Sequence, residues 1–252
     1  MMEDTLPESR IIRLDSVGST NAYAAELANK GNLPEGSVVI ASTQTEGRGH
    51  GTNTWESEPG KNLTFSMILY PRFLPTGRQF ILTKVVALGV RETISQLLPK
   101  HNVSIKWPND IYIDDRKVAG ILIQHSIMGL GIDNTIVGIG LNVNQLKFHS
   151  KAPNPVSLCM ISGQEFDLND VLGLLCRNIE KYYELLRSRH FGQLDKAYLE
   201  YFYRINTFCK FRKGDCIIEA QITGVSTYGQ LMMDTREGDF LKFAMKEVEF
   251  VL

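Results

Sequence analysis

Short apolar runs separated by polar turns fill the first half of the chain. Their β-branched and aromatic residues predict strands at 11–14, 37–41, 63–69, 103–107, 111–113, 118–123 and 135–141. In the run 63–69, apolar and small polar residues alternate, which is typical of a strand with one buried face. Two polar pairs, Asp114–Asp115 and Asp133–Asn134, are expected to form turns between strands.

Other segments show the helical spacing of apolar residues. Positions three and four apart predict helices at 22–28, 78–98, 167–188 and 194–203. The segment 19–21 offers capping oxygens to the first helix, and Gly31 suits its end. After Asn206 the pattern changes to short strands separated by glycine turns, at 208–211, 216–222, 231–233 and 240–244. This C-terminal part predicts a small β-barrel docked on the main body.

The composition is that of an ordinary globular protein. The chain has 252 residues, 43% hydrophobic and 22% charged, which is enough for one large domain with a small appendage. Its net charge of -1 provides no overall field that would attract nucleic acid or an anionic membrane. The acidic start lacks an apolar leader, and no apolar run approaches the roughly 20 residues of a membrane span.

The four cysteines are scattered along the chain. None forms a C-x-x-C pair, and no histidine lies at ligand spacing from them. This pattern favours buried free thiols over a metal site. Free thiols fit a reducing compartment, so we expect a cytoplasmic protein.

The segment 106–110, with the sequence KWPND, carries the strongest chemical signal. Pro108 fixes its own backbone and keeps the preceding residue out of the helical region, so the segment is extended or turning. A second basic run, RKVAG, occupies 116–120. Several positive groups beside a single acid suit a site that handles a phosphate-bearing, negatively charged intermediate.

Two glycine-rich segments are further candidates for ligand contact. In 44–51 (QTEGRGHG), Arg48 lies between glycines whose backbone N–H groups can cradle an anion. A flexible surface hairpin with a solvated arginine is the alternative. In 138–144 (GIGLNVN), the strand glycines permit close approach of a ligand, and Asn142 and Asn144 share one face. A bulge closed by asparagine-capped turns explains that pattern equally well.

Together these segments resemble the biotin protein ligases, from about residue 10 to the C-terminus. The matching motifs follow the order of that family: 19–21, Gln44 with 47–49, Trp55, 106–110, 116–122 and 138–142. The resemblance implies an α+β fold, with a central mixed sheet and flanking helices like those of class II synthetases and biotin ligases, plus a C-terminal SH3-like β-barrel. It implies a catalytic domain at 1–204 that binds biotin and ATP, and a barrel at 205–252.

The reaction of that family has two steps. The biotin carboxylate first attacks the α-phosphate of ATP, giving biotinyl-5′-AMP and pyrophosphate; a lysine amine of an acceptor protein then attacks the mixed anhydride, and AMP leaves. The resemblance thus implies ATP and biotin as substrates and Mg2+ as an accompanying ion. The implied partner is biotin carboxyl carrier protein or a carboxylase domain. A homodimer is compatible with it. DNA is not an expected partner, because no helix-turn-helix pattern precedes the first strand. A membrane is not expected either, because no apolar run is long enough to span one.

The resemblance also assigns individual residues. Those implied to bind biotin are Ser19, Thr20, Asn21, Gln44, Gly47, Arg48, Gly49, His50, Lys117 and Gly120. Those implied to bind ATP are Arg48, Trp55, Lys106, Asn109, Lys117, Asn142 and Asn144. The catalytic set is Lys106, Asp110, Lys117 and Arg48. A core position is favoured for Trp107.

Asp110 is expected to serve the second step. A free lysine has a pKa of about 10.4, so the acceptor amine must lose a proton before it attacks. A nearby carboxylate can orient that amine and accept the proton. The structural alternative is a turn aspartate that pairs with Lys106.

The chain departs from the family pattern at His50, where a second basic residue is common. We expect the adenylate to leave the site faster as a result. Two other functions are open: a lipoate ligase or octanoyl transferase of the same superfamily, and a non-catalytic sensor of biotin or nucleotide. The Gly-Arg-Gly loop together with KWPND favours biotin.

Overall fold

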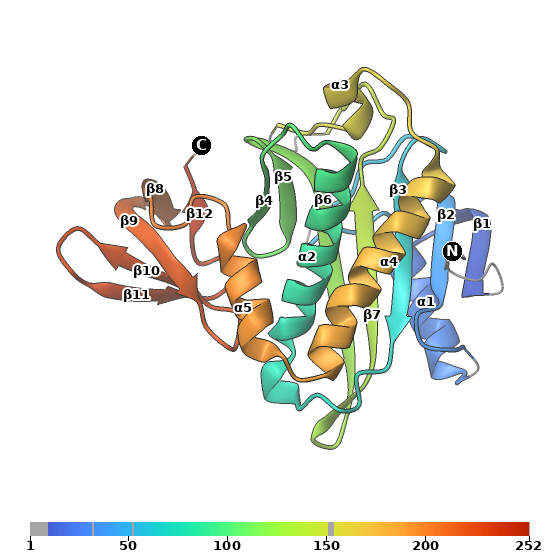
Figure 1. The fold of residues 1–252 in the computed structure, drawn as a ribbon, viewed down its shortest axis with the longest axis horizontal. Helices are drawn as coiled ribbons and strands as arrows, with labels where there is room; N and C mark the ends of the chain where they lie inside the picture. The colour runs from blue at the N-terminus through green and yellow to red at the C-terminus, as the bar shows by residue number, and fades with distance from the viewer. Residues whose placement is uncertain (1–9, 32, 52, 151–153, 252) are drawn as a thin grey trace.

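The computed structural model describes residues 10–31, 33–51, 53–150 and 154–251. Its main body is built on a seven-stranded sheet in the order β1-β2-β3-β7-β6-β5-β4 (Figure 1). The strands are β1 (Ile11–Val17), β2 (Val38–Gln44), β3 (Leu63–Leu69), β4 (Val103–Lys106), β5 (Asp110–Ile113), β6 (Arg116–Met128) and β7 (Gly131–Leu141). Strands β1 and β2 are parallel, and the other neighbouring pairs are antiparallel. The predicted mixed sheet is therefore confirmed.

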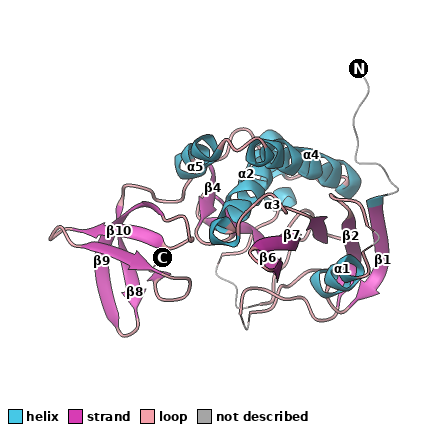
Figure 2. Ribbon diagram, turned by 90° about the horizontal axis from the view of Figure 1, so that it is seen from below, coloured by secondary structure: helices cyan, strands magenta, loops and turns pink. Residues whose placement is uncertain are grey.

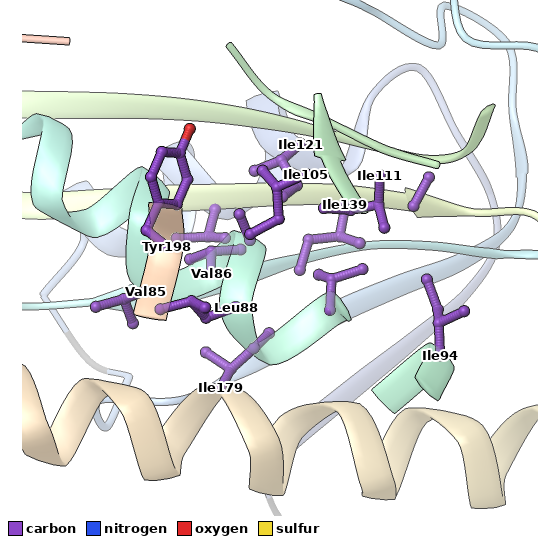
Figure 3. Packing of buried hydrophobic residues seen from close by; sticks show 14 of the residues in the cluster. Val85, Val86, Leu88, Ile94, Ile105, Ile111, Ile121, Ile139, Ile179 and Tyr198 are labelled. Atoms are coloured by element: carbon purple, nitrogen blue, oxygen red, sulfur yellow. The ribbon is translucent and has the colours of Figure 1, made fainter. Parts of the chain in front are cut away.

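Helices cover the two faces of this sheet unequally. They are α1 (Thr20–Asn29), α2 (Phe80–Leu97), α3 (Leu158–Ser162), α4 (Leu168–Arg187) and α5 (Phe191–Glu200), with a 3-10 turn at Thr76–Arg78. Helices α2 and α4 lie on one face, and α1 lies on the other (Figure 2). Val85 and Ile179 of these two helices belong to the same buried cluster as Ile121 and Ile139 of the sheet (Figure 3). Within the described ranges, no helix combines the length and apolarity needed to cross a membrane.

Two predictions about the sheet are wrong. Strand β3 is not half buried: all seven of its residues are buried, because α2 and α4 cover one face while α1 and the site described below cover the other. Asp133–Asn134 is not a turn, because both residues lie in β7. The β6–β7 hairpin turns instead at Gly129 and Leu130, where Gly129 has a φ of 62° that glycine adopts without strain. Helix α3 has no counterpart among the predicted elements.

The C-terminal part is a five-stranded antiparallel sheet in the order β11-β10-β9-β8-β12. Its strands are β8 (Phe208–Lys213), β9 (Cys216–Val225), β10 (Leu231–Thr235), β11 (Phe240–Phe243) and β12 (Glu249–Phe250), of which only β12 is absent from the predicted set. Trp107 joins it to the main body, since its Nε1 donates to the Gly229 carbonyl at 2.9 Å. Trp107 is buried, as expected of a core residue. The domain boundary between residues 204 and 205 stays a prediction.

The four cysteines are all free, as predicted. Cys159 and Cys176 are buried, but Cys209 is only partly buried and Cys216 is exposed. The expectation of buried thiols is therefore wrong for Cys216. This residue begins β9 beside the β8–β9 turn, where the small C-terminal sheet is open to solvent.

Helices α2 and α4 cross closely at Gly89. A Cβ atom on this residue would lie 2.7 Å from Cγ1 and 2.8 Å from Cα of Ile179, closer than real Cβ atoms approach. Glycine has a low helix propensity. Its presence in the middle of α2 is therefore explained by the contact with the α4 backbone.

We expect Gly89→Ala to lower the free energy of unfolding by about 1–3 kcal/mol through overpacking, although alanine favours an isolated helix by about 1 kcal/mol. Gly173→Ala on α4 is the matched control, because its Cβ would meet only Arg177 Nη1 at 3.6 Å. That control should be as stable as the natural chain or more stable. Urea unfolding measures both, and an unchanged or raised stability for Gly89→Ala would contradict the close crossing.

Candidate functional site

The face of the sheet that carries α1 is only partly covered by it. At one end, α1 buries a small cluster made of Ala24, Ala28, Val39, Ile68 and Ile136. At the other end, one lateral row crosses five strands through the register pairs Thr64–Gly140, Gly140–Gly120, Gly120–Asp110 and Asp110–Lys106. Residues in lateral register point to the same face. The two glycines therefore leave a shallow floor, with the polar residues of the row on either side.

Trp55 lies on this glycine floor. A Cβ on Gly140 would fall 2.5 Å from Cζ2 and 2.6 Å from Nε1 of the indole, and a Cβ on Gly120 would fall 2.9 Å from its Cζ3. The Nε1 group is buried and has no hydrogen-bond partner. An unsatisfied buried donor costs about 1–3 kcal/mol. The indole therefore brings one unsatisfied hydrogen-bond donor to the floor of the site.

A pocket surrounds this floor, and most of the predicted site residues line it. They are Ser19, Thr20, Asn21, Gln44, Arg48, Gly49, His50, Trp55, Asn109, Asp110, Lys117 and Gly120. These residues come from the start of α1, the end of β2, the loop after β2, the turn before β5, and strands β5 and β6. Gly47 lies directly behind, where a Cβ would meet the Trp55 carbonyl oxygen at 2.7 Å.

One end of the pocket is neutral and rich in hydrogen-bonding groups. The Gln44 side-chain oxygen accepts from the backbone N–H of Thr20 at 2.8 Å and from its hydroxyl at 3.1 Å. Asn21 Nδ2 donates to the Leu122 carbonyl at 3.2 Å. The Ser66 hydroxyl is within hydrogen-bond distance of Thr20 Oγ1 and Asn21 Oδ1, at 2.8 and 2.6 Å. This network holds the side chains of Thr20, Asn21 and Gln44 in place at the pocket wall.

Ser19 takes the N-cap position of α1 but makes no capping hydrogen bond through its side chain. Its backbone is extended, with a φ of -151°, and the residue is buried. The Ser19 hydroxyl therefore does not cap α1, although the sequence suggested that it would. The residue contributes to the pocket wall instead.

The opposite end of the pocket carries the charges. Lys117 Nζ and an Asp110 carboxylate oxygen are 2.6 Å apart, with about a fifth to a quarter of each side chain exposed. The Lys117 ammonium lies 5.7 Å from the centre of the Trp55 ring. Arg48 is more exposed, and its guanidinium lies 3.6 Å from the carboxylate of Glu46. Asn109 is tied down, since its Nδ2 donates to the Ile121 carbonyl at 2.6 Å.

Lys106 lies outside the group of pocket-lining residues. Its Nζ contacts the Tyr112 hydroxyl at 3.2 Å and lies 5.1 Å from the ring centre of Phe250 in the C-terminal sheet. Burial lowers the pKa of the Lys106 ammonium, and the nearby Asp110 carboxylate only partly offsets this effect. Asp110 forms its ion pair with Lys117. Asp110 therefore does not form the purely structural ion pair with Lys106 that was the alternative to a catalytic role.

Asn142 and Asn144 also lie outside the pocket lining. Asn142 Nδ2 donates to the Val156 carbonyl at 3.1 Å, while its Oδ1 is buried without a partner. Asn144 exchanges two hydrogen bonds with the backbone of Phe166, at 2.8 and 3.0 Å. These bonds hold the segments after β7 in place. The unpaired oxygen leaves Asn142 with one free acceptor.

Some pocket residues have no counterpart in the predicted set, such as Asn53 and Thr54. Ser66, which anchors the neutral end, was also missed. The alternation of Thr64 and Ser66 in β3 was a usable signal, because it places both hydroxyls on one face. Gly138 belongs to the predicted segment 138–144 and lines the pocket, where a Cβ would lie 2.8 Å from Asn21 Cγ.

Comparison with known proteins identifies the fold and the family. Residues 14–144 match the model of the biotin/lipoate A/B protein ligase family. The chain belongs to this family. It is 32% identical over 231 residues to the bifunctional ligase/repressor BirA of Bacillus spizizenii, covering 90% of this chain and 70% of that protein. The biotin--[acetyl-CoA-carboxylase] ligase of Paracoccus denitrificans is 29% identical, with 85% and 90% covered.

A solved structure of a family member has the same fold. The biotin protein ligase of Aquifex aeolicus, in complex with biotin and ATP, superposes with a TM-score of 0.78 at 27% identity, covering 96% of this chain and 99% of that one. Both the seven-stranded sheet and the C-terminal sheet therefore belong to the biotin ligase fold.

We expect Gly140→Ala to displace Trp55 from the floor, because its new methyl group occupies the position of the indole. The chain has two tryptophans, so the change is best made in a Trp107→Phe background, where Trp55 alone fluoresces. Trp55 emission should shift to the red and be quenched more strongly by acrylamide. Gly192→Ala, whose Cβ would meet nothing within 4 Å, is the control. Unchanged emission in Gly140→Ala would contradict the described contact.

Proposed function

We propose that this chain is a biotin protein ligase, which activates biotin with ATP to biotinyl-5′-AMP and transfers biotin to a lysine of a carboxylase carrier protein. The observation that supports it most is the pocket itself, with a neutral hydrogen-bonding end and a charged end on one open face of the sheet. Biotin has the same two-ended chemistry, a neutral ureido ring and a carboxylate. The Paracoccus denitrificans relative is a biotin--[acetyl-CoA-carboxylase] ligase, and the Aquifex aeolicus structure holds biotin and ATP.

In this proposal the ureido ring of biotin lies at the neutral end. Ser19, Thr20, Asn21 and Gln44 supply its hydrogen-bond partners. The side chains of Thr20, Asn21 and Gln44 are already held by bonds to one another, to Ser66 and to β6, so little of their conformational freedom is lost on binding. Gly47, Gly49 and His50 close the pocket through the loop.

The carboxylate of biotin and the α-phosphate of ATP then meet at the charged end. Lys117 and Arg48 neutralise these two anions, and Trp55 and Asn109 form the adjoining wall. Catalysis of this step consists of placing two mutually repelling groups together and stabilising charge at phosphorus. Lys106, Asn142 and Asn144 are proposed to act on the nucleotide from the surrounding segments. The unpaired oxygen of Asn142 supports such a contact.

Asp110 is proposed to act only in the transfer step. In the structure its carboxylate is occupied by Lys117 at 2.6 Å. Once the adenylate forms, its phosphate attracts Lys117, and Asp110 becomes available. It then orients the acceptor lysine and takes up the proton that the amine loses when nitrogen attacks the carbonyl carbon and AMP leaves.

Mg2+ is proposed to enter with ATP. No group of three or more His, Cys, Asp or Glu side chains in the described part of the chain could hold a metal ion. Magnesium is commonly held by one or two carboxylates together with substrate phosphates and water. The residues present fit a metal ion carried mainly by the phosphates of ATP and by water.

The remaining features of the proposal concern partners. The acceptor is the biotin carboxyl carrier protein or the corresponding carboxylase domain. The net charge of -1 supports the proposal that DNA is not a partner. A homodimer and a cytoplasmic location stay predictions. The alternative acyl substrates are lipoate and octanoate, which lack a ureido ring to engage the amides and hydroxyls of the neutral end.

Biotin-dependent exchange between ATP and labelled pyrophosphate tests the proposed activity. The chain should catalyse exchange with biotin and Mg2+ present, and only at background rate with lipoate or octanoate in its place. Exchange that is independent of biotin, or equal with lipoate, would contradict the assignment. Binding of biotin without any exchange would point to the sensor function instead.

We expect Asp110→Asn to retain pyrophosphate exchange but to transfer biotin to the carrier protein about 10²-fold more slowly, the range for loss of a general base. Asp114→Asn is the matched control. It makes the same chemical change in the β5–β6 turn, where residue 114 has a φ of 54° that asparagine tolerates. Transfer at the normal rate by Asp110→Asn, measured with preformed biotinyl-AMP, would rule out this role.

A further inference from the structure

Residues 47–51 and 53–55, beside the pocket, are the two sides of a narrow hairpin, and Gly51 ends the first side. The Gly49 N–H donates to the Asn53 carbonyl at 2.8 Å, and the Trp55 N–H donates to the Gly47 carbonyl at 3.0 Å. Gly49, His50 and Asn53 line the pocket, so the tip residue Gly51 lies at its rim. Gly51 has a φ of 69°, in the left-handed region that favours glycine.

A lysine from the C-terminal sheet reaches this tip. The ammonium of Lys246, in the turn between β11 and β12, occupies the place where a Cβ on residue 51 would be, and Lys246 Cε is 2.9 Å from that position. The contact joins two segments nearly two hundred residues apart in the sequence. The end of the lysine side chain fills the space beside the Gly51 Cα.

Lys246 is held in an unfavourable backbone conformation. Its φ is 73°, which is uncommon for a residue with a long side chain. The turn is fixed by Glu247, whose carboxylate accepts from the Ala244 N–H at 2.7 Å and whose N–H donates to the Ala244 carbonyl at 3.2 Å. Strain of this kind persists where the surrounding structure over-determines it and is often found at ligand sites.

The charges near the loop indicate what this lysine can contribute. Arg48 is the arginine of the hairpin, and its guanidinium is partly neutralised by Glu46 at 3.6 Å. Lys246 has no ion pair with any residue in the described part of the chain, so its charge is available. The ammonium adds a second positive charge at the rim, next to the residues that close the pocket.

We propose that Lys246 is a positioning residue, which draws the C-terminal sheet and the hairpin residues 47–51 and 53–55 together over the bound adenylate. It also supplies this hairpin with a second positive charge toward the phosphate. This inference rests on the proposed ligase function. It adds that retention of the phosphate-bearing intermediate depends on the Lys246 ammonium, which comes from the C-terminal sheet and lies beside Gly51.

The test measures how long the protein retains biotinyl-AMP. The protein is loaded with biotin and α-labelled ATP, free nucleotide is removed, and release of the labelled adenylate is followed after a chase with unlabelled adenylate. Lys246→Ala should release it about fivefold faster, the upper range for a partly screened charge contact. Lys246→Arg should restore retention to within about twofold.

A further variant separates function from folding. Lys246→Gly removes the charge and also relieves the positive φ, so its melting temperature should equal or exceed that of the natural chain. Its release of adenylate should nevertheless be as fast as that of Lys246→Ala. Lys242→Ala in β11 is the control, because this exposed lysine lies over the Phe240 ring at 5.3 Å on the same sheet. It should leave retention unchanged.

The outcomes are distinguishable. Normal retention by Lys246→Ala, equal loss in Lys242→Ala, or no rescue by Lys246→Arg would overturn the role of Lys246 while leaving the ligase proposal intact. Failure of the natural chain to form any adenylate would instead overturn the proposed function.

Discussion

The pairing of Gly120 with Gly140 across β6 and β7 is the constraint on which the site depends. A side chain at either position would occupy the space of the Trp55 indole. Gly138, two residues before Gly140 in β7, likewise leaves space for the side chain of Asn21. Glycine in a strand costs about 0.5–1 kcal/mol relative to alanine, and the large core under α2 and α4 offsets this cost. The open face of the sheet is thus kept free by the absence of side chains.

The edge of the sheet links this floor to the C-terminal part. Asp110 continues the glycine row into β5 and holds Lys117, while Lys106 at the end of the same row reaches Phe250 of the C-terminal sheet. Trp107, next in the chain, donates to Gly229. The KWPND segment is therefore both a wall of the pocket and the attachment of the second sheet.

The sequence was most informative where a local rule fixed the outcome. Asp167 and the apolar stripe after it predicted α4 within a residue at each end, because the N-cap and helical spacing are local properties. The pocket residues from Ser19 to Gly120 were found through motifs of the family, and the fold brings most of them together. Their roles in binding and catalysis stay predictions.

The rest depended on tertiary contacts that no local rule contains. Strand β3 looks half buried in sequence because its polar residues are small, yet Ser66 is buried in the site network. The position of Lys106 follows from its contacts with Tyr112 and Phe250, which are set by strand register and by docking of a separate sheet. The contact of Lys246 with Gly51 joins the two parts of the chain and has no signal in either segment alone.

A crystal structure of the chain with biotin tests the central claim most directly, that the glycine floor with its two unlike ends is the substrate site. The account predicts biotin on the α1 face of the sheet, with its ureido ring at Thr20, Asn21 and Gln44 and its carboxylate beside Lys117. Biotin bound elsewhere, or bound in the reverse direction with its ring at Lys117, would contradict it.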